Sequence, residues 1–341
     1  MMSDVLYLSS RELSELASYG EYVDSITDGY RQRGNGGTAS SPTTISTKRI
    51  DDEYNSYINS YMAHLPEDGI AGTYQFSVDR DDRWYIATLY DTTNGEPIAL
   101  LDGGSWMSTK TGAIAAVGAD ALARSDASTV GIIGSGRVAR ESLRAFCEVR
   151  DIQRVVVYSR TKDNRESFAA SMEAELDKTV VPVPTEAEAV SGADIVLTAT
   201  TAPEPVLDGA LLDDGTHVCA MGQSGAQREL DDTTVARAKY VPDVRSRTTP
   251  SSHQERMKSA GAFVSAYQSG EIADNHVYAE LGDVVANRVP GRESDAEITV
   301  FDSTGTGIET VAAAHMLYKR ALDEGLGTGI EVSSLTESFD Q

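Results

Sequence analysis

Three small residues separate an apolar run from a helical pattern in the stretch TVGIIGSGRVARESLRAF, residues 129–146. Gly134, Gly136 and Ala139 give the spacing G-x-G-x-x-A. The first glycine permits a tight turn, the second lets the backbone approach a pyrophosphate, and the alanine allows close helix–strand packing. N–H groups at the helix start then hold the negative charge. An ordinary strand-to-helix turn is the alternative. Because an apolar, strand-like run precedes this spacing and a helical pattern follows it, we predict a dinucleotide-binding site. The pyrophosphate of the dinucleotide is expected to contact Gly134, Gly136, Arg137, Val138 and Ala139.

The end of the next strand, VVVYSRTKDNRESFA at 155–169, indicates which dinucleotide is bound. An acidic residue there would hold the free ribose 2′-hydroxyl of NAD. This chain instead has Ser159, Arg160 and Thr161, which we expect around the adenosine ribose. Arg160 can pair with a 2′-phosphate through charge-assisted hydrogen bonds of about 1.5–3 kcal/mol each, or it can only stack on the adenine. The pattern favours NADP(H) over NAD(H).

The predicted dinucleotide site lies in a part of the chain, from residue 129 onward, where strand-like and helical patterns alternate. Strand-like runs separated by helical patterns are typical of a doubly wound parallel sheet of the Rossmann type. One late strand and a glycine turn follow in EITVFDSTGTG, at 297–307. The earlier strands are expected near 129–133, 155–158, 180–183, 194–198, 217–221 and 239–241.

The first part of the chain has a different order of elements, one helix followed by several strands, which predicts a separate α+β domain. Apolar residues at helical spacing predict one helix over 9–33, and GNGGTASSPTT, at 34–44, predicts a loop. A helix of small residues, 109–123, leads out of this part, and an amphipathic helix at 308–325 is expected to return to it. Strands are expected at 61–65, 72–78, 83–91 and 97–103, with TTNG at 92–95 as a hairpin turn. The predicted domains are 1–115 completed by 308–341, and 116–307.

The composition disfavours several classes of function. The 341 residues include 53 acidic and 29 basic side chains, and the net charge of −24 repels nucleic-acid phosphates and anionic lipid. Scattered acid with only seven lysines is typical of a halophile's cytosolic protein, and a merely acidic protein of a mesophile is the alternative. We find no apolar run that could span a membrane and no secretory signal, so a cytoplasmic protein is expected. The two cysteines and five histidines lack the spacing of a disulfide framework or a metal site.

Further motifs are spread along the chain: GEPIALLDG (95–103), STKTGA (108–113), GIIGSGRVA (131–139), SRTKDNRESFA (159–169), ADIVLTATT (193–201), GTHVCAMGQ…RELD (215–231) and ITVFDSTGTGIETV (298–311). Together they resemble the ornithine cyclodeaminase/mu-crystallin family over nearly the whole chain, and SRTKDNRESFA is most similar to its NADPH-binding mu-crystallin branch. The resemblance implies a homodimer whose first domain dimerises through antiparallel strands. It also implies a substrate between that domain and the nicotinamide, and hydride transfer between nicotinamide C4 and the Cα of an amino acid, through an imine.

The substrate end departs from the family pattern. Members usually have an arginine where this chain has Lys110. A lysine keeps the positive charge but cannot bind a carboxylate through the two parallel hydrogen bonds that a guanidinium forms. They usually have a lysine where Tyr74 stands, and a tyrosine hydroxyl can donate one hydrogen bond but brings no charge. An upstream arginine of the family matches Arg49, or else Lys48. Lys110 could instead be a surface lysine at a helix start. We expect Arg49, Tyr74 and Lys110 to orient the substrate.

The residues that would handle protons also depart from the family. Ornithine cyclodeaminases have an aspartate where this chain has Gln223, which can position a group but cannot usefully accept a proton. A dehydrogenase or imine reductase could use bound water, Lys110 or another titratable group. Asp302, on the late strand that passes near the nicotinamide in the family, is a candidate, or it only caps the following turn. The resemblance places Thr200, Met221 and Gly222 beside the nicotinamide.

The leading interpretation is a homodimeric, NAD(P)-dependent oxidoreductase that transfers hydride at the Cα of a small amino acid or its imine, as alanine dehydrogenases and ketimine reductases do. Ornithine cyclodeaminase, which forms proline and ammonia with the cofactor recycled, is the first alternative, and Gln223 argues against it. An NADPH-dependent small-ligand-binding protein without turnover is the second. No metal, nucleic acid or membrane is expected to take part.

Overall fold

The chain forms two compact units. The computed structural model describes residues 3–40, 43–47, 56–79, 82–222, 228–245 and 261–334, and the structural statements below concern these residues. The first unit comprises Met1–Lys110 and Thr306–Gln341, and the second comprises Thr111–Gly305. The helix α3 (Met107–Leu122) contains the first point of division.

The second unit is a parallel sheet with helices on its faces. Its strands are β8 (Thr129–Ile133), β9 (Arg154–Tyr158), β10 (Thr179–Val183), β11 (Ile195–Thr198), β12 (His217–Ala220), β13 (Lys239–Pro242) and β14 (Thr299–Asp302). Its further helices are α4 (Arg137–Val149), α5 (Lys162–Leu176), α6 (Glu186–Val190), α7 (Asp232–Arg237), α9 (Gly261–Ser269) and α10 (Leu281–Val285), with 3₁₀ turns at Gly209–Leu211 and Asp274–His276.

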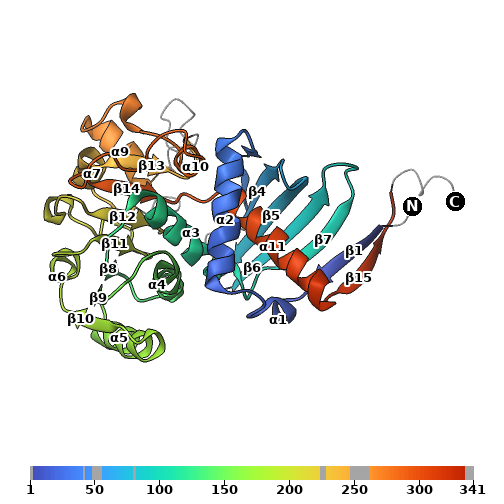
Figure 1. Ribbon diagram of the computed structural model, residues 1–341, viewed down its shortest axis with the longest axis horizontal. Coiled ribbons are helices and arrows are strands. Elements are labelled where there is room, and N and C mark those ends of the chain that lie inside the picture. Colours follow the sequence, from blue (N-terminus) through green and yellow to red (C-terminus); the bar gives the residue numbers. More distant parts are fainter. Residues whose placement is uncertain are drawn as a thin grey trace. The chain divides into compact units, whose positions relative to one another are not determined.

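The strand order in the described part of this sheet is β10-β9-β8-β11-β12-β14-β13, and every neighbouring pair is parallel. Figure 1 shows α4, α5 and α6 around the β8–β10 end of the sheet, and α7, α9 and α10 around the β13–β14 end. The order reverses between β8 and β11, which is where such sheets bind ligands beyond the strands' carboxyl ends. The prediction of a doubly wound parallel sheet and of an α+β fold for the other part of the chain is confirmed.

The central strands have apolar sequences without alternation because both of their faces are covered. All four residues of β11, β12 and β14 are buried. Even His217 in β12 lies fully inside, with its Nδ1 2.9 Å from the Thr299 hydroxyl. Burial lowers the pKa of His217 to about 3, so the ring is neutral and belongs to the core.

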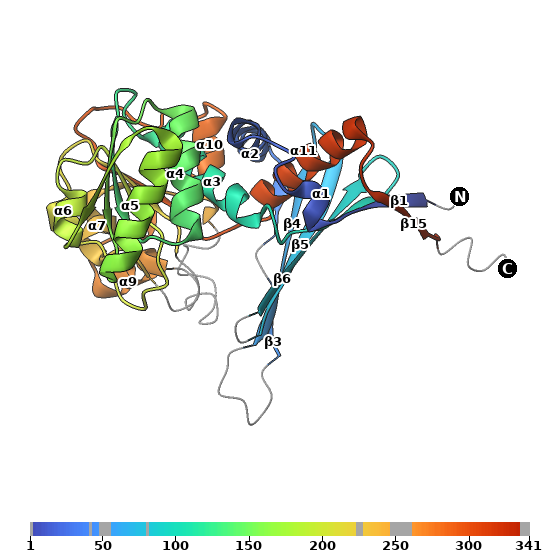
Figure 2. The ribbon, with the colours of Figure 1, turned by 90° about the horizontal axis from the view of Figure 1, so that it is seen from below.

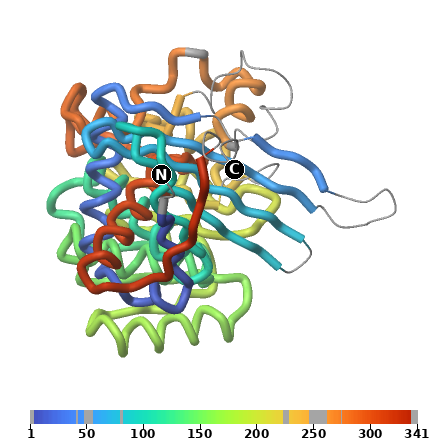
Figure 3. Tube along the Cα trace, turned by 90° about the vertical axis from the view of Figure 1, so that its right-hand side faces the viewer, coloured from blue at the N-terminus to red at the C-terminus, as the bar shows by residue number. Residues whose placement is uncertain are grey.

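The first unit is a mixed sheet with helices on one face. Its strands are β1 (Ser3–Leu8), β2 (Thr38–Ala39), β3 (Thr43–Ser46), β4 (Tyr57–Leu65), β5 (Ile70–Asp79), β6 (Asp82–Asp91), β7 (Pro97–Asp102) and β15 (Thr328–Val332), and its other helices are α1 (Ser10–Leu13), α2 (Tyr19–Gly34) and α11 (Ile308–Glu324). The order is β15-β1-β7-β6-β5-β4-β2 among the described strands, with β3 also on β4. Figure 2 shows α2 and α11 on one face of this sheet, and Figure 3 shows blue α2 beside red α11.

Local patterns predict most of this unit, but not all of it. The single helix expected over 9–33 is wrong, because Ser9 and Ser18 each begin a capping box, with Glu12 and Glu21 respectively, and so start two separate helices. The loop expected over 34–44 includes β2 and the start of β3. The strands β1 and β15 were not expected; they pair with each other from opposite ends of the chain. The hairpin between β6 and β7 is confirmed.

Candidate functional site

The glycine corner of the second unit has the backbone geometry that its sequence predicts. Gly134 has a φ of +123°, and a Cβ there would lie 2.3 Å from the carbonyl oxygen of Ala199. Its N–H donates to the carbonyl of Tyr158 over 2.9 Å. A left-handed φ and this close approach both require glycine. The corner is therefore fixed between the ends of β9 and β11, at the carboxyl edge of the sheet.

Gly136 differs from Gly134, because the protein itself gives no reason for a glycine there. Its φ of −77° suits any residue, and a Cβ at this position would meet no atom within 4 Å. Gly136 is the N-cap of α4, and no side chain caps that helix's first turn, which contains Arg137, Val138 and the fully buried Ala139. Open space above uncapped N–H groups at a helix start fits a dinucleotide pyrophosphate.

The second strand brings Ser159 to this corner. The hydroxyl of Ser135, in the glycine loop, donates to the hydroxyl of Ser159 over 2.9 Å. Arg165 holds the same turn, because its guanidinium donates to the Ser159 carbonyl over 3.0 Å. Arg160 and Thr161 follow with exposed side chains, at the start of α5. The structure thus brings Ser159 to the glycine loop and leaves Arg160 and Thr161 exposed next to it in sequence, and their contact with an adenosine ribose stays a prediction.

A buried acid joins two of the three residues expected beside the nicotinamide, Thr200 and Gly222. Thr200 follows β11, and Met221 and Gly222 follow β12, which is the neighbouring parallel strand. The fully buried carboxylate of Glu229 accepts hydrogen bonds from the N–H groups of Thr200 (2.5 Å) and Gly222 (2.7 Å). Sequence analysis missed this residue, although it lies in the RELD motif. Glu229 directly precedes the buried Leu230, and this position next to a core residue was the feature that could have indicated a buried acid.

Asp302 lies fully buried at the end of β14, where its carboxylate accepts the hydroxyl of Tyr240. Burial, and then the Asp302 carboxylate, raise the pKa of Tyr240 well above its usual value, so the phenol stays neutral. The turn after β14 is bonded to a second acid, because Asp243 accepts the Thr304 hydroxyl (2.6 Å) and the Gly305 N–H (2.5 Å). Asp243 thus holds Thr304 and Gly305 of this turn, and sequence analysis did not single it out.

The first unit brings Lys110 and Tyr74 together. Lys110 is only 6% exposed, so the alternative of a surface lysine is wrong. Its ammonium lies 3.8 Å from the carboxylate of Glu309 and 5.6 Å from the centre of the Tyr74 ring. Glu309, at the start of α11, also accepts the N–H and the hydroxyl of Thr306. The sequence predicts Glu309 only as part of the amphipathic helix at 308–325. Its position in the first helical turn after the GTG motif was the feature that could have indicated a role in the site.

Tyr74 belongs to a group of stacked rings on β4, β5 and β6. Its ring centre lies 5.8 Å from that of Tyr61, 5.6 Å from that of Phe76 and 6.3 Å from that of Tyr85. Burial, followed by the neighbouring Tyr85, raises the pKa of Tyr74 well above its usual value. Tyr74 is therefore a neutral hydrogen-bond donor beside a buried ammonium, within an apolar, aromatic surrounding.

Several expected site residues lie outside the described residues, namely Arg49, its alternative Lys48, and Gln223. Their roles stay predictions. Within the described ranges, no group of three or more His, Cys, Asp or Glu side chains could hold a metal ion. No helix of the described chain is both long and apolar enough to cross a bilayer.

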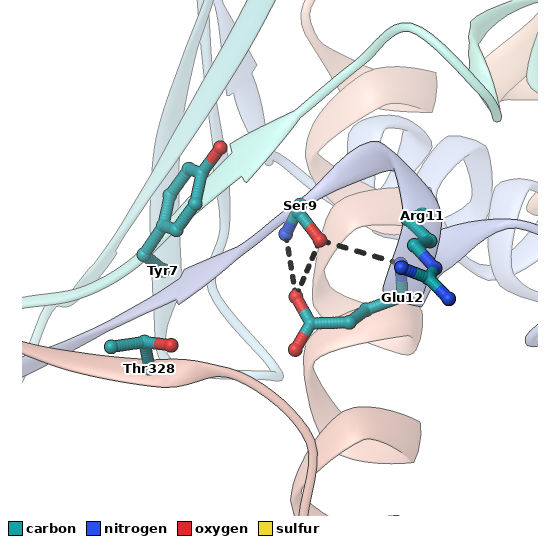
Figure 4. A pocket seen from close by; sticks show the side chains of 5 residues that line it. All are labelled: Tyr7, Ser9, Arg11, Glu12 and Thr328. Carbon is teal, nitrogen blue, oxygen red and sulfur yellow. Dashed lines mark hydrogen bonds between the residues drawn. The ribbon is translucent and has the colours of Figure 1, made fainter.

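A cavity of about 530 Å³ opens elsewhere in the first unit, and it contains none of the expected site residues. Two of its polar side chains, Ser9 and Glu12, already serve local structure, because Glu12 accepts the N–H (2.9 Å) and the hydroxyl (2.6 Å) of Ser9 and the N–H of Gly327 (3.1 Å). These bonds start α1 and attach it to the segment before β15. We assign no chemistry to this cavity, which is shown in Figure 4 and lined by Tyr7, Ser9, Arg11, Glu12 and Thr328.

Comparison with known proteins identifies the family. The model of the ornithine cyclodeaminase/mu-crystallin family matches residues 6–325. The chain belongs to this family. This confirms the resemblance to the ornithine cyclodeaminase/mu-crystallin family that the sequence motifs indicate. The matched range includes the glycine corner, Ser159 and the buried Lys110.

Relatives within the ornithine cyclodeaminase/mu-crystallin family include reductases and dehydrogenases. A Δ1-pyrroline-2-carboxylate reductase of Bacillus cereus is 35% identical over 247 residues, which are 72% of this chain and 74% of that protein. The structure of the Thermococcus litoralis Δ1-pyrroline-2-carboxylate reductase with NADH and L-proline is 32% identical, with a TM-score of 0.86 over 96% of this chain and 100% of that one. An archaeal alanine dehydrogenase dimer with bound NAD is 28% identical, with a TM-score of 0.85 over 97% and 100%.

Proposed function

We propose that this protein is a nicotinamide-dependent oxidoreductase that interconverts a small amino acid and its imine, and that a cyclic imino acid such as Δ1-pyrroline-2-carboxylate is its preferred substrate. The observation that carries the proposal is Lys110, an ammonium buried beside Glu309 in a chain with only seven lysines. A buried cation beside a neutral phenol suits a small carboxylate. The names of the related reductases support the same substrate class.

In this proposal, residues of the chain bind and orient the substrate, while the cofactor supplies the hydride and water supplies the proton. The nicotinamide, when bound, donates or accepts the hydride. Lys110 binds the substrate carboxylate, and the Tyr74 hydroxyl donates a hydrogen bond to the substrate. In the reducing direction the imine carbon gains the hydride, the C=N π electrons move to nitrogen, and nitrogen takes a proton from water. The stacked rings around Tyr74 favour a flat cyclic imine over the open-chain imine of alanine.

The test is a substrate panel with purified protein, both reduced cofactors, and low and multimolar KCl. We expect Δ1-pyrroline-2-carboxylate to consume NADPH or NADH faster than pyruvate with ammonium does. The acidic composition leads us to place the protein in the cytoplasm of a halophile, with activity rising with KCl. Proline formed from ornithine and NAD⁺ without net NADH would instead indicate a cyclodeaminase. Tight cofactor binding without turnover of any substrate would indicate a binding protein.

Arg160 is proposed to select NADP(H). Arg160→Ala is expected to weaken NADPH binding about tenfold or more and NADH binding about twofold or less, because only the 2′-phosphate forms a charge-assisted bond with this guanidinium. Titration calorimetry with both cofactors measures the two affinities, and Arg154→Ala, an exposed arginine on β9, is the matched control. Equal losses for both cofactors would mean that Arg160 only stacks on the adenine.

A homodimer is proposed through the exposed face of the first unit's sheet. Ile58 and Met62 on β4 and Trp84 and Ile86 on β6 are 43–69% exposed. Such apolar patches mark interaction surfaces, and one neighbour, the archaeal alanine dehydrogenase, is a dimer. Trp84→Glu with Ile86→Lys is expected to give monomers in light scattering coupled to size-exclusion chromatography. The control Leu322→Lys changes an exposed leucine of α11 and should leave the dimer intact. A variant that stays dimeric places the interface elsewhere.

A further inference from the structure

A single buried carboxylate connects two neighbouring strand ends of the second unit. Glu229 accepts the Thr198 hydroxyl at the end of β11 over 2.8 Å, in addition to the N–H groups of Thr200 and Gly222. The acid is fully buried. The groups that bind it therefore come from the last residue of β11, from the segment after it, and from the segment after β12.

The backbone around Glu229 is fixed before its side chain acts. Its carbonyl accepts the N–H groups of Val206 (2.8 Å) and Leu207 (3.2 Å), so the carboxylate is held at one place. Gly222 has no room for a side chain, because a Cβ there would lie 2.5 Å from the Glu229 carboxyl group and 2.6 Å from the carbonyl oxygen of Thr200. The three residues thus form one closely packed bridge between the two strand ends, which we call the Glu229 bridge.

We propose that Glu229 is a positioning residue for the nicotinamide, and that its carboxylate sets the backbone of Thr200 and Gly222 against which the ring is held. This inference rests on the proposed function. The Glu229 bridge lies at the carboxyl edge of β11 and β12, beside the switch point where doubly wound sheets bind their ligands. Holding two loop segments with one carboxylate orders them before the ligand arrives, which favours a single orientation of the reacting ring.

The test compares ligands with and without the nicotinamide ring. Glu229→Gln keeps the shape but replaces one accepting oxygen with an NH₂ group that cannot accept a hydrogen bond. We expect NADH or NADPH affinity to fall about tenfold or more, and kcat to fall with it, while the affinity for the matching ADP-ribose or its 2′-phosphate changes by about twofold or less. Titration calorimetry and steady-state kinetics measure these quantities. Thermal unfolding of the variant checks that the fold is intact.

The matched control is Asp231→Asn, two residues away. Asp231 also accepts several donors, from Gly209 and Thr234, but it starts α7 and does not join the strand ends. Asp231→Asn should lower the unfolding free energy but should not change the affinity for the dinucleotide relative to that for the ADP-ribose fragment. Thr198→Val, which removes the hydroxyl donor at the end of β11, should reproduce the Glu229→Gln pattern in a weaker form. Equal losses for the dinucleotide and the ADP-ribose fragment, or no change in either, would overturn the inference alone. Absence of dinucleotide binding by the wild type would overturn it together with the proposed function.

Discussion

Lys110→Met is expected to lower kcat/KM for the imine substrate about ten- to a hundredfold, which corresponds to one lost hydrogen bond between charged groups. The loss should appear mainly in KM, because a carboxylate is bound equally in the ground state and the transition state. Cofactor affinity should stay unchanged, since Lys110 belongs to the first unit and the glycine corner to the second. Steady-state kinetics and titration calorimetry check both statements.

A loss of folding could imitate this result, so the charge partner must be changed as well. Removing Lys110 alone leaves the Glu309 carboxylate buried, and breaking a buried ion pair costs about 3–5 kcal/mol of unfolding free energy. The double variant Lys110→Met, Glu309→Gln removes both charges and should recover much of that stability without recovering KM. Lys239→Met, which breaks a pair with the exposed Glu293, is the control. A folded double variant with wild-type KM would show that Lys110 does not bind the carboxylate.

Gly136→Ala is expected to weaken dinucleotide binding about tenfold or more with little effect on the apoprotein. The added methyl group meets no protein atom and the φ is ordinary, so the unfolding free energy should change by about 1 kcal/mol or less, as for an N-cap exchange. A pyrophosphate approached by the bare backbone would, however, meet the methyl group directly. Calorimetric titration and thermal unfolding without cofactor separate the two quantities.

Gly134→Ala should behave in the opposite way. A side chain at φ +123° placed 2.3 Å from the Ala199 carbonyl forces the backbone to move, so the apoprotein itself should be destabilised. Wild-type dinucleotide affinity in Gly136→Ala would contradict the pyrophosphate site at this corner. Wild-type stability in Gly134→Ala would contradict the backbone geometry described here.

Local sequence patterns predict those parts of the molecule whose causes are local. The glycine corner, the buried strands of the second unit and the hairpin between β6 and β7 each depend on a few consecutive residues, and all were foreseen. The pairing of β1 with β15 depends on residues at opposite ends of the chain, and neither strand was expected. Glu309 and Glu229 were missed for the same reason. Their partners, Lys110 for the first and Thr198 for the second, are distant in sequence, so the local patterns at RELD and after GTG do not indicate which groups these acids contact.

The first unit contains both ends of the chain, and this has a consequence during synthesis. Residues up to Lys110 leave the ribosome before the second unit, but α11, which covers β4, β5 and β6, begins only after Thr306. At typical elongation rates the early strands wait about 10 to 40 s for that cover. The contiguous second unit can fold in the meantime, whereas the nascent sheet keeps apolar strand faces open to other chains. Prematurely terminated products that lack α11 are therefore expected to aggregate, and protection by a chaperone matters most during this interval.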